Sequence, residues 1–322
     1  MRKLLVLGLI VIGFAITACA GQEAQKDVYL FSYFQGNGED GLHLAYSLDG
    51  YTFKALNNNE SFLKPELTAD KLMRDPCIIQ GPDGLYHMAW TVSWWEKGIG
   101  YANSEDLIHW SEQQYIPVME HEPDAKNCWA PELYYDEANA RYLIFWATTI
   151  PGRFPETDNQ SSEEPPAPGN NHRMYYTWTK DFQEFADTEI FYNKGFNVID
   201  ATIEKEGDTY MMFLKDETNK PFEPQKNIRL ATADQAAGPY SEPSEPITGD
   251  YWAEGPTAIK IDGKWIVYFD KYIDHNMGAV MSEDLENWTD ISGRINFPEG
   301  TRHGTVYRVP WEVLDRLMEV GG

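Results

Sequence analysis

The stretch "SEDLENW" at residues 282–288 nearly repeats "SEDLIHW" at residues 104–110. Looser copies occur at "SLDGYTF" (47–53), "TKDFQEF" (179–185) and "TADQAAGPY" (232–240). In each copy a small polar residue precedes an aspartate by two positions, and an aromatic residue follows. The shared aspartates recur about 50 to 75 residues apart, a spacing typical of chains that repeat one supersecondary unit. They are Asp49, Asp106, Asp181, Asp234 and Asp284. The repetition predicts five units.

The units consist of short runs rich in Tyr, Trp, Val and Ile, separated by Gly, Asp and Asn. In unit two "GLYHMAWTVS" (84–93) precedes "KGIGYANSEDLIHW" (97–110), and in unit five "GKWIVYFDKY" (263–272) precedes "MGAVMSEDLENW" (277–288). This composition favours strands, and four short strands per repeat are typical of a propeller blade. We therefore expect an all-β fold, a five-bladed β-propeller. The repeated aspartate is then a turn residue that binds backbone N–H groups, and the tryptophan after it packs between neighbouring sheets.

The N-terminus carries an export signal. Arg2 and Lys3 precede an apolar run that ends in "ITAC", at Cys19. We expect a signal peptide over 1–18 that is removed, and a polar tether over 19–27. The "ITAC" ending resembles the bacterial lipoprotein cleavage box, which predicts that Cys19 carries a lipid; an ordinary signal peptide is the alternative. The predicted location is the bacterial cell envelope, anchored by lipid in the membrane, on its periplasmic or surface side.

Composition narrows the classes of partner. The formal net charge of −25 repels nucleic acid, so we expect no nucleic-acid partner. Past the signal only Cys77 and Cys128 remain, too few for a disulfide scaffold, and we expect buried apolar cysteines, with pairing across adjacent blades left open. The aromatic content of 14% suits either carbohydrate stacking or propeller core packing. We expect a monomer.

Residues 28–322 are expected to form one domain, since no linker divides them. The stretch 151–172, "PGRFPETDNQSSEEPPAPGNNH", breaks the pattern and predicts a long loop inserted in unit three, either a flap beside a ligand or a solvated excursion. Residues 311–320, "WEVLDRLMEV", have apolar positions at helical spacing and predict a short helix.

Four carboxylates begin the predicted innermost strands: Asp75, Glu132, Asp200 and Glu254. We expect one at the same place in each of four blades, so that they converge at the propeller axis. Crowded carboxylates differ in proton affinity, which lets an acid and a base coexist at neutral pH. Such a pair is what cleavage of a glycosidic bond requires. Glu132 is the one that we would first assign to strand capping instead.

Five motifs carry a resemblance to a known family. In chain order they are "RDPCI", "WAPEL", "VIDATI", "WAEGP" and "RHGTV", and they resemble the motifs of glycoside hydrolase family 43 over essentially the whole mature chain. The resemblance implies that Asp75 is the general base, Asp200 an orienting and pKa-modulating aspartate, and Glu254 the general acid. It also implies that His303 sits beside a bound cation through water.

The resemblance implies an inverting hydrolase of plant-type oligosaccharides or polysaccharides. It implies α-L-arabinofuranosyl or β-xylosyl substrates, with galactosyl sugars also known in the family, and exo-action is favoured. No cofactor is required, although a structural Ca²⁺ on the axis is compatible with it. We assign substrate binding to Trp129, Glu132, Trp252 and His303; either tryptophan could equally belong to the core.

Two other functions are alternatives to a family-43 hydrolase. The stretch "SLDGYTF" resembles a motif of sialidase propellers, but that resemblance implies six blades and an arginine triad, whereas this sequence has five units and acidic axial positions. A non-catalytic glycan-binding lipoprotein would use the same pocket, and loss of Asp75 or Glu254 would mark it. Because the proposed base lies in the second unit, "GTVYRV" (304–309) is expected to close the ring against the first unit, 28–59, unless the closure differs.

Overall fold

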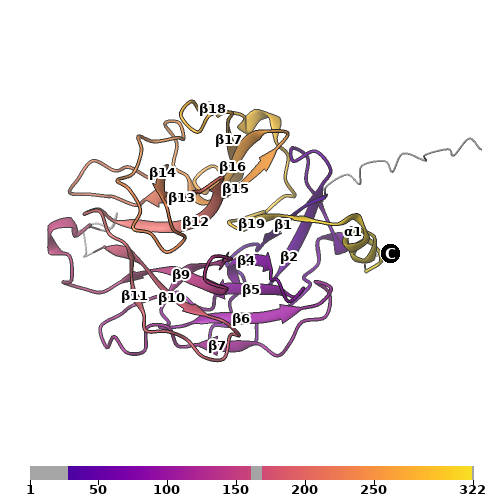
Figure 1. The fold of residues 1–322 in the computed structure, drawn as a ribbon, viewed down its shortest axis with the longest axis horizontal. Coiled ribbons are helices and arrows are strands. Elements are labelled where there is room, and N and C mark those ends of the chain that lie inside the picture. The colour runs from indigo at the N-terminus through magenta and orange to yellow at the C-terminus, as the bar shows by residue number, and fades with distance from the viewer. Residues whose placement is uncertain (1–27, 161–168, 321–322) are drawn as a thin grey trace, which may run out of the picture.

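Five antiparallel sheets surround a common axis in the computed structural model, which describes residues 28–160 and 169–320 (Figure 1). The predicted all-β fold and the five-bladed β-propeller are confirmed. The predicted signal peptide, Cys19 and the tether lie outside the described residues, as does the segment 161–168 of the predicted insertion.

Blades I and II contain the first strands of the chain. From the axis outward, blade I has β19 (Thr305–Val309), β1 (Val28–Tyr33), β2 (His43–Ser47) and β3 (Lys54–Ala55). Blade II has β4 (Arg74–Gln80), β5 (Tyr86–Thr91), β6 (Ile99–Ser104) and β7 (Gln114–Ile116).

Blades III to V follow in chain order. Blade III has β8 (Trp129–Asp136), β9 (Arg141–Thr149), β10 (His172–Thr179) and β11 (Glu189–Tyr192). Blade IV has β12 (Val198–Glu206), β13 (Thr209–Asp216) and β14 (Asn227–Ala233), and blade V has β15 (Glu254–Ile261), β16 (Lys264–Lys271), β17 (Asn276–Ser282) and β18 (Thr289–Asp290). Short 3₁₀ turns lie at η1 (Asn57–Asn59), η2 (Pro155–Thr157) and η3 (Ser292–Arg294).

The ring closes between the two ends of the described chain. Strand β19 pairs antiparallel with β1, and Thr305 lies opposite Ser32. The predicted closure by residues 304–309 is therefore confirmed. One sheet is thus built from both ends of the chain, and residues 302–305 are brought to the axis.

The repeated turn is architectural, as predicted. Asp284 Oδ1 accepts the backbone N–H groups of Glu286 and Asn287 at 2.9 and 2.8 Å. Asp106 does the same for Ile108 and His109. Trp110 packs against the apolar cluster between blades I and II, and Trp288 against the cluster between blades IV and V. Asp49 and Asp181 accept matching bonds.

Blade IV departs from the predicted four strands, because it has three. The chain after β14 runs through Pro239, Pro243 and Pro246, and a proline has no N–H to give to a strand ladder. Two serine side chains take over part of that role. Ser241 Oγ accepts the N–H of Thr232, and Ser244 Oγ accepts the N–H of Leu230, both at 3.0 Å.

Apolar clusters fill the spaces between neighbouring blades, one at each of the five interfaces. The cluster between blades I and II also takes in Val313, Leu314 and Leu317 of α1 (Trp311–Glu319), which lies on the outer side of blade I (Figure 1). The predicted short helix is confirmed. Both Cys77 and Cys128 are buried and unpaired, so the predicted apolar role holds and the alternative of a disulfide does not.

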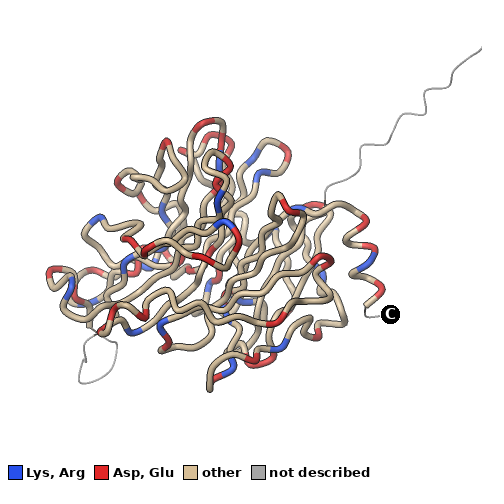
Figure 2. The backbone as a smooth tube through the Cα atoms, turned by 60° about the horizontal axis from the view of Figure 1, so that its bottom comes forward, with Lys and Arg blue, Asp and Glu red and all other residues tan. Residues whose placement is uncertain are grey.

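The acidic residues lie mainly along the loops around the whole molecule (Figure 2). No helix within residues 28–160 and 169–320 is both long enough and apolar enough to cross a membrane.

Ring closure gives a testable prediction at Gly304. A Cβ at this position would lie 1.7 Å from the carbonyl oxygen of Ser32, so an alanine cannot fit unless β19 moves away from β1. We expect Gly304→Ala to lower the free energy of unfolding by about 3 kcal/mol, the upper end of the usual cost of overpacking. The measurement is urea unfolding followed by tryptophan fluorescence. Gly293→Ala is the matched control, since nothing lies within 4 Å of a Cβ there. Equal unfolding midpoints for the two variants would contradict the closure.

Candidate active site

Each of four inner strands carries a β-bulge at its start. The pairing register shifts within the segments RDPC (74–77), WAPE (129–132), IDAT (199–202) and EGPT (254–257). The second residue of each segment has left-handed backbone, with φ of 52° at Asp75, 46° at Ala130, 51° at Asp200 and 59° at Gly255. A bulge sets two residues against one on the partner strand and re-aims their side chains. The first two residues of a segment can therefore both face the axis.

The bulges correct one expectation from the sequence. The prediction of one carboxylate at the same position of each blade is right for Asp75 and Asp200, which are both second in their segments. It is wrong for the two glutamates, because Glu254 stands first and Glu132 stands fourth. A difference of a few positions along a bulged strand changes the depth at which a side chain reaches the axis.

A pocket of about 150 Å³ opens where the first and second residues of these segments meet. It brings together Asp75, Asp200, Glu254, Trp129 and His303 from the predicted site. The remaining lining residues are Arg74, Thr91, Trp94, Ile199, Lys215, Glu217 and Tyr272. The three predicted catalytic carboxylates therefore converge on one axial pocket.

Asp75 is held in its ionised form. Thr91 Oγ1 donates a hydrogen bond to Asp75 Oδ2 at 2.8 Å, and His303 Nδ1 lies 3.4 Å from Asp75 Oδ1. Burial alone would raise the pKa of this carboxyl, but the hydrogen bond and the charge of His303, with Arg74 and Thr91, outweigh it and lower the pKa to about 2. Asp75 can therefore accept a proton at neutral pH.

His303 is the cationic partner in this pair. Burial alone would lower the pKa of the imidazole, yet the hydrogen bond and charge of Asp75, with the charges of Asp200 and Glu132, raise the pKa to about 9. His303 is thus an imidazolium at neutral pH.

Asp200 lies deepest of the three carboxylates. It is buried, and its Oδ2 accepts the N–H of Gly255 at 3.0 Å. Burial raises the pKa of Asp200 above its ordinary range, and the charges of Glu254 and Asp75 add to this, while His303 and Lys215 oppose it. Asp200 thus favours its protonated form more than Asp75 does.

Glu254 stands between two cations. Lys215 Nζ lies 3.0 Å from Glu254 Oε2, and Arg302 Nη2 lies 3.5 Å from Glu254 Oε1. The side chain of Glu254 is 22% exposed, so it is the most accessible of the three carboxylates. It is in a position to reach an atom that enters from the mouth.

Trp129 forms part of the pocket wall. Its Nε1 donates a hydrogen bond to the carbonyl oxygen of Trp94 at 2.9 Å, and its ring packs against His172, Trp94 and Trp95. Trp252 does not line the pocket. It is 42% exposed, and its ring lies 6.0 Å from that of Tyr272, which does line it.

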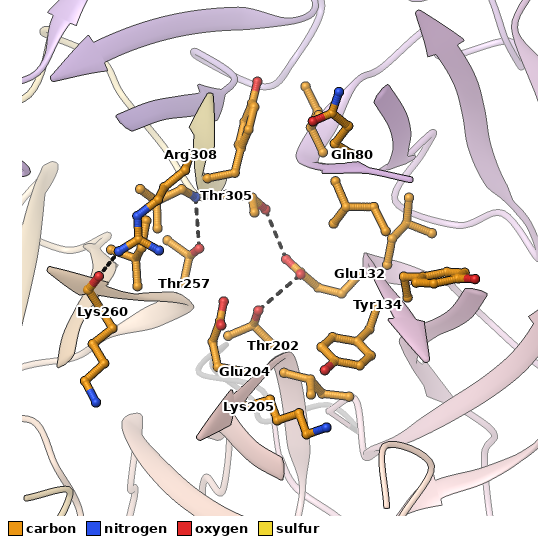
Figure 3. Close-up of a pocket in the computed structure, with 18 of the residues that line it drawn as sticks. Gln80, Glu132, Tyr134, Thr202, Glu204, Lys205, Thr257, Lys260, Thr305 and Arg308 are labelled. Atoms are coloured by element: carbon orange, nitrogen blue, oxygen red, sulfur yellow. Dashed lines mark hydrogen bonds between the residues drawn. The ribbon is translucent and has the colours of Figure 1, made fainter. Parts of the chain in front are cut away.

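Glu132 lies below the pocket, in a second hollow of about 560 Å³ formed by all five inner strands (Figure 3). It accepts hydrogen bonds from Cys77 Sγ, Thr202 Oγ1 and Thr305 Oγ1 at 3.2 to 3.3 Å, which ties four inner strands together across the axis. Burial raises the pKa of Glu132 to about 7. The structure therefore does not bring this predicted substrate-binding residue to the pocket that holds the other carboxylates.

Several pocket residues were not predicted from the sequence. Arg74 of the pocket belongs to the quoted motif "RDP", and Arg302, which contacts Glu254 without lining the pocket, belongs to "RHGT", so a signal existed for both. Lys215 stands alone in the apolar run "YMMFLK" of β13, which is an unusual place for a lysine and could have marked it. Glu217 and Tyr272 had no comparable signal.

The side chains around the axis can be compared with the ligands that the predicted cation beside His303 would need. Among the described residues no group of three or more His, Cys, Asp or Glu side chains could hold a metal ion. His303 faces Asp75, and a protonated imidazole offers no lone pair to a metal. The predicted cation beside His303 is held through water and needs no such lone pair, so it and the axial Ca²⁺ stay predictions, and no step of the proposed reaction uses either.

The chain resembles carbohydrate-cleaving proteins. A family profile described as "Probable glycosyl hydrolase domain", related to glycosyl hydrolase family 43, matches residues 25–314. An α-L-arabinofuranosidase of Bifidobacterium longum subsp. longum is 24% identical over 248 residues, which make up 66% of this chain and 23% of the relative. The chain thus spans about a quarter of that relative's length.

Two solved structures show the same fold. An α-L-arabinofuranosidase from Lactobacillus brevis matches with a TM-score of 0.51 at 19% identity, over 68% of this chain and 72% of that one. A thermostable family-43 glycoside hydrolase matches with a TM-score of 0.54 at 16% identity, over 72% of this chain and 78% of that one.

The Asp75–His303 pair gives a prediction on pH. Because the pKa of His303 is raised from 6.5 to about 9 and that of Asp75 is lowered from 3.8 to about 2, the pair stabilises the fold fully between pH 3.8 and pH 6.5. This stabilisation is lost as the pH rises through 9 or falls through 2. We expect imidazole ¹⁵N shifts to show His303 still protonated at pH 8, and Asp75→Asn to move its titration to lower pH. A wild-type midpoint near 6.5 would refute the pairing.

Proposed function

The chain is a glycoside hydrolase that belongs to the family-43 type of glycosyl hydrolase domains, and we propose that it removes single terminal sugars with inversion of the anomeric centre. The observation that carries the proposal is the convergence of Asp75, Asp200 and Glu254 on one axial pocket. A non-catalytic glycan-binding role would leave this set of carboxylates without a purpose.

Asp75 acts as the general base in the proposed reaction. Its carboxylate is kept ionised by His303 and fixed in orientation by Thr91, so it takes a proton from water as the water attacks the anomeric carbon. In an inverting enzyme the two carboxyl groups stand roughly 6.5 to 9.5 Å apart, so that this water fits between base and sugar.

Glu254 acts as the general acid. It stands on blade V, across the pocket from Asp75 on blade II, and gives its proton to the departing glycosidic oxygen. Asp200 interacts electrostatically with Glu254, and we assign it the task of modulating the acid. This is the modulating role that the family resemblance implied.

The pocket supports action on chain ends. A volume of about 150 Å³ is well below the roughly 300 to 1,000 Å³ of pockets that enclose larger ligands, so it suits one sugar unit. Trp129 and Trp94 offer ring surface to that sugar. We propose α-L-arabinofuranosyl substrates first, since a curated relative and a solved neighbour are α-L-arabinofuranosidases, then β-xylosyl and galactosyl ones.

The substrate panel is the direct test. Wild-type protein is assayed on aryl α-L-arabinofuranoside, β-xyloside and β-galactoside, and we expect release of the aryl group from at least one of them. NMR should show that the first-formed sugar has the anomeric configuration opposite to that of the substrate. Asp75→Asn should lower kcat by about 10²- to 10⁴-fold on every substrate, the usual contribution of a general base. Glu254→Gln should spare activated aryl glycosides and cripple poor leaving groups, because only the latter need the proton.

Two outcomes would count against this mechanism. Equal losses on good and poor leaving groups would remove Glu254 from the acid role. Full activity of Asp75→Asn, in a protein that unfolds at the wild-type temperature, would remove Asp75 from the base role.

We propose that the enzyme is lipid-anchored in the cell envelope. The support is the charged and apolar N-terminal segment followed by "ITAC" at Cys19. When the wild-type chain is expressed in a bacterial host, we expect it in the membrane fraction. We expect Cys19→Ala either in the soluble fraction or with its signal peptide uncleaved. Cell fractionation and the mass of the N-terminal peptide check both expectations. Identical partition of both forms would contradict the anchor.

A further inference from the structure

Six charged side chains of alternating sign form a chain that passes through the pocket wall, where its three middle members Glu217, Lys215 and Glu254 line the pocket; we term it the charge chain. In order they are Lys226, Glu217, Lys215, Glu254, Arg302 and Asp270. Lys226 contacts Glu217 at one end, and Arg302 lies 2.6 Å from Asp270 at the other. The proposed acid Glu254 is a middle member of the chain.

Lys215 is the most constrained cation of the chain. Its side chain is 2% exposed, on β13, and its ammonium lies 4.6 Å from the centre of the Tyr272 ring. Burial alone would lower the pKa of this lysine, but the charges of Glu217 and Glu254 outweigh burial and raise it. A buried charge is tolerated only when it is paired, so Lys215 depends on these two glutamates.

The contacts of Glu254 conflict with its proposed task. A proton donor must be protonated before it acts, yet a cation nearby favours the ionised carboxylate. Glu254 has two such cations, at 3.0 and 3.5 Å.

The charge chain resolves the conflict, because each cation has a second and nearer partner. Lys215 is 2.7 Å from Glu217 and 3.0 Å from Glu254. Arg302 is 2.6 Å from Asp270 and 3.5 Å from Glu254. When Glu254 takes up a proton, neither cation is left buried without an anion.

We propose that Lys215 is a positioning residue for the proton-donating step: it holds the Glu254 carboxyl in place and sets the pH above which Glu254 has lost its proton. Glu217 supports it as the anion that keeps Lys215 paired while Glu254 is protonated. The inference rests on the proposed role of Glu254 as the acid and deepens it. Lys215 acts through Glu254 and is not itself a catalytic residue.

The other charged or titratable groups around Glu254 come from four further parts of the fold. Asp200 on β12 and Asp270 on β16 act on it as like charges, and Arg302 before β19 as an opposite one. Lys226 and Tyr272 also interact with it electrostatically. Lys215 is the nearest cation of this set.

The decisive experiment is a titration that does not depend on activity. The side-chain carboxyl carbon of Glu254 is followed by ¹³C NMR from pH 3 to 10, and its signal is assigned by its loss in Glu254→Gln. In Lys215→Met the midpoint should rise by about one pH unit or more, since an opposite charge this close shifts a carboxyl by roughly 1 to 3 units. Lys215→Arg should keep the wild-type midpoint.

A second variant predicts a shift of the opposite sign. Glu217→Gln leaves Lys215 with Glu254 as its remaining carboxylate partner, so the ionised form of Glu254 is favoured and the midpoint should fall. Lys226→Met is the matched control: it is a similarly buried lysine that contacts Glu217 but lies further from Glu254, and it should shift the midpoint less than Lys215→Met.

The kinetic readout should follow the titration. The alkaline limb of the kcat/KM profile should move to higher pH in Lys215→Met and to lower pH in Glu217→Gln, with kcat for poor leaving groups lowered in Lys215→Met. A structural clamp would instead lower the unfolding temperature and leave the midpoint alone. A substrate contact would raise KM without moving either pH readout.

The outcomes separate this inference from the proposed function. An unchanged Glu254 midpoint in folded Lys215→Met, or shifts of the same sign in Lys215→Met and Glu217→Gln, would overturn the role of Lys215. If Lys215→Met does not fold, Glu217→Gln alone decides, since a fall in the midpoint is expected and no change refutes it. Inactivity of the wild type on the whole panel would instead count against the proposed function, and the titration would still be decided.

Discussion

The pairing of β19 with β1 is the constraint on which the rest of the site depends. It joins the last strand of the ring to the first, and it brings Arg302 and His303 to the axis. His303 then meets Asp75 of blade II, and Arg302 meets Glu254 and Asp270 of blade V. Closure therefore completes the charge pairing of the pocket: Asp75 gains its cation His303 through it, and Glu254 gains Arg302 in addition to Lys215 of blade IV.

The bulges on the inner strands are the second requirement. A regular strand sends alternate side chains to opposite faces, so it would offer the axis one residue in two. The bulge at RDPC presents Arg74 and Asp75 to the same pocket, and the bulge at EGPT lets Gly255 donate its N–H to Asp200 beside Glu254. Below the bulges the strands resume, and Cys77 and Thr202, the fourth residues of two segments, donate hydrogen bonds to Glu132 together with Thr305 of β19.

The sequence predicted the blade count, the ring closure, the turn aspartates and the convergence of three carboxylates, because each leaves a local signal that repeats or sits in a motif. It did not predict depth along the axis. Whether Glu132 reaches the pocket or the second hollow below it depends on a bulge between residues 129 and 132, and a bulge has no side-chain signature of its own. Nor did it predict that blade IV has three strands instead of four, although the prolines after residue 238 were a signal for it.

The environment of Glu254 shows what single motifs leave out. Its motif indicates an acid, while its neighbours Lys215 and Arg302 favour a carboxylate. Lys215 comes from the second strand of blade IV and Arg302 from the approach to blade I, so neither is near Glu254 in the chain. The pocket combines an Asp75 carboxylate held ionised by His303 with a Glu254 carboxyl whose cations have nearer partners of their own. The base Asp75 thus has a cation of its own, whereas the acid Glu254 shares each of its cations with another carboxylate. This difference is a physical basis for the opposite roles of two carboxyl groups in one pocket.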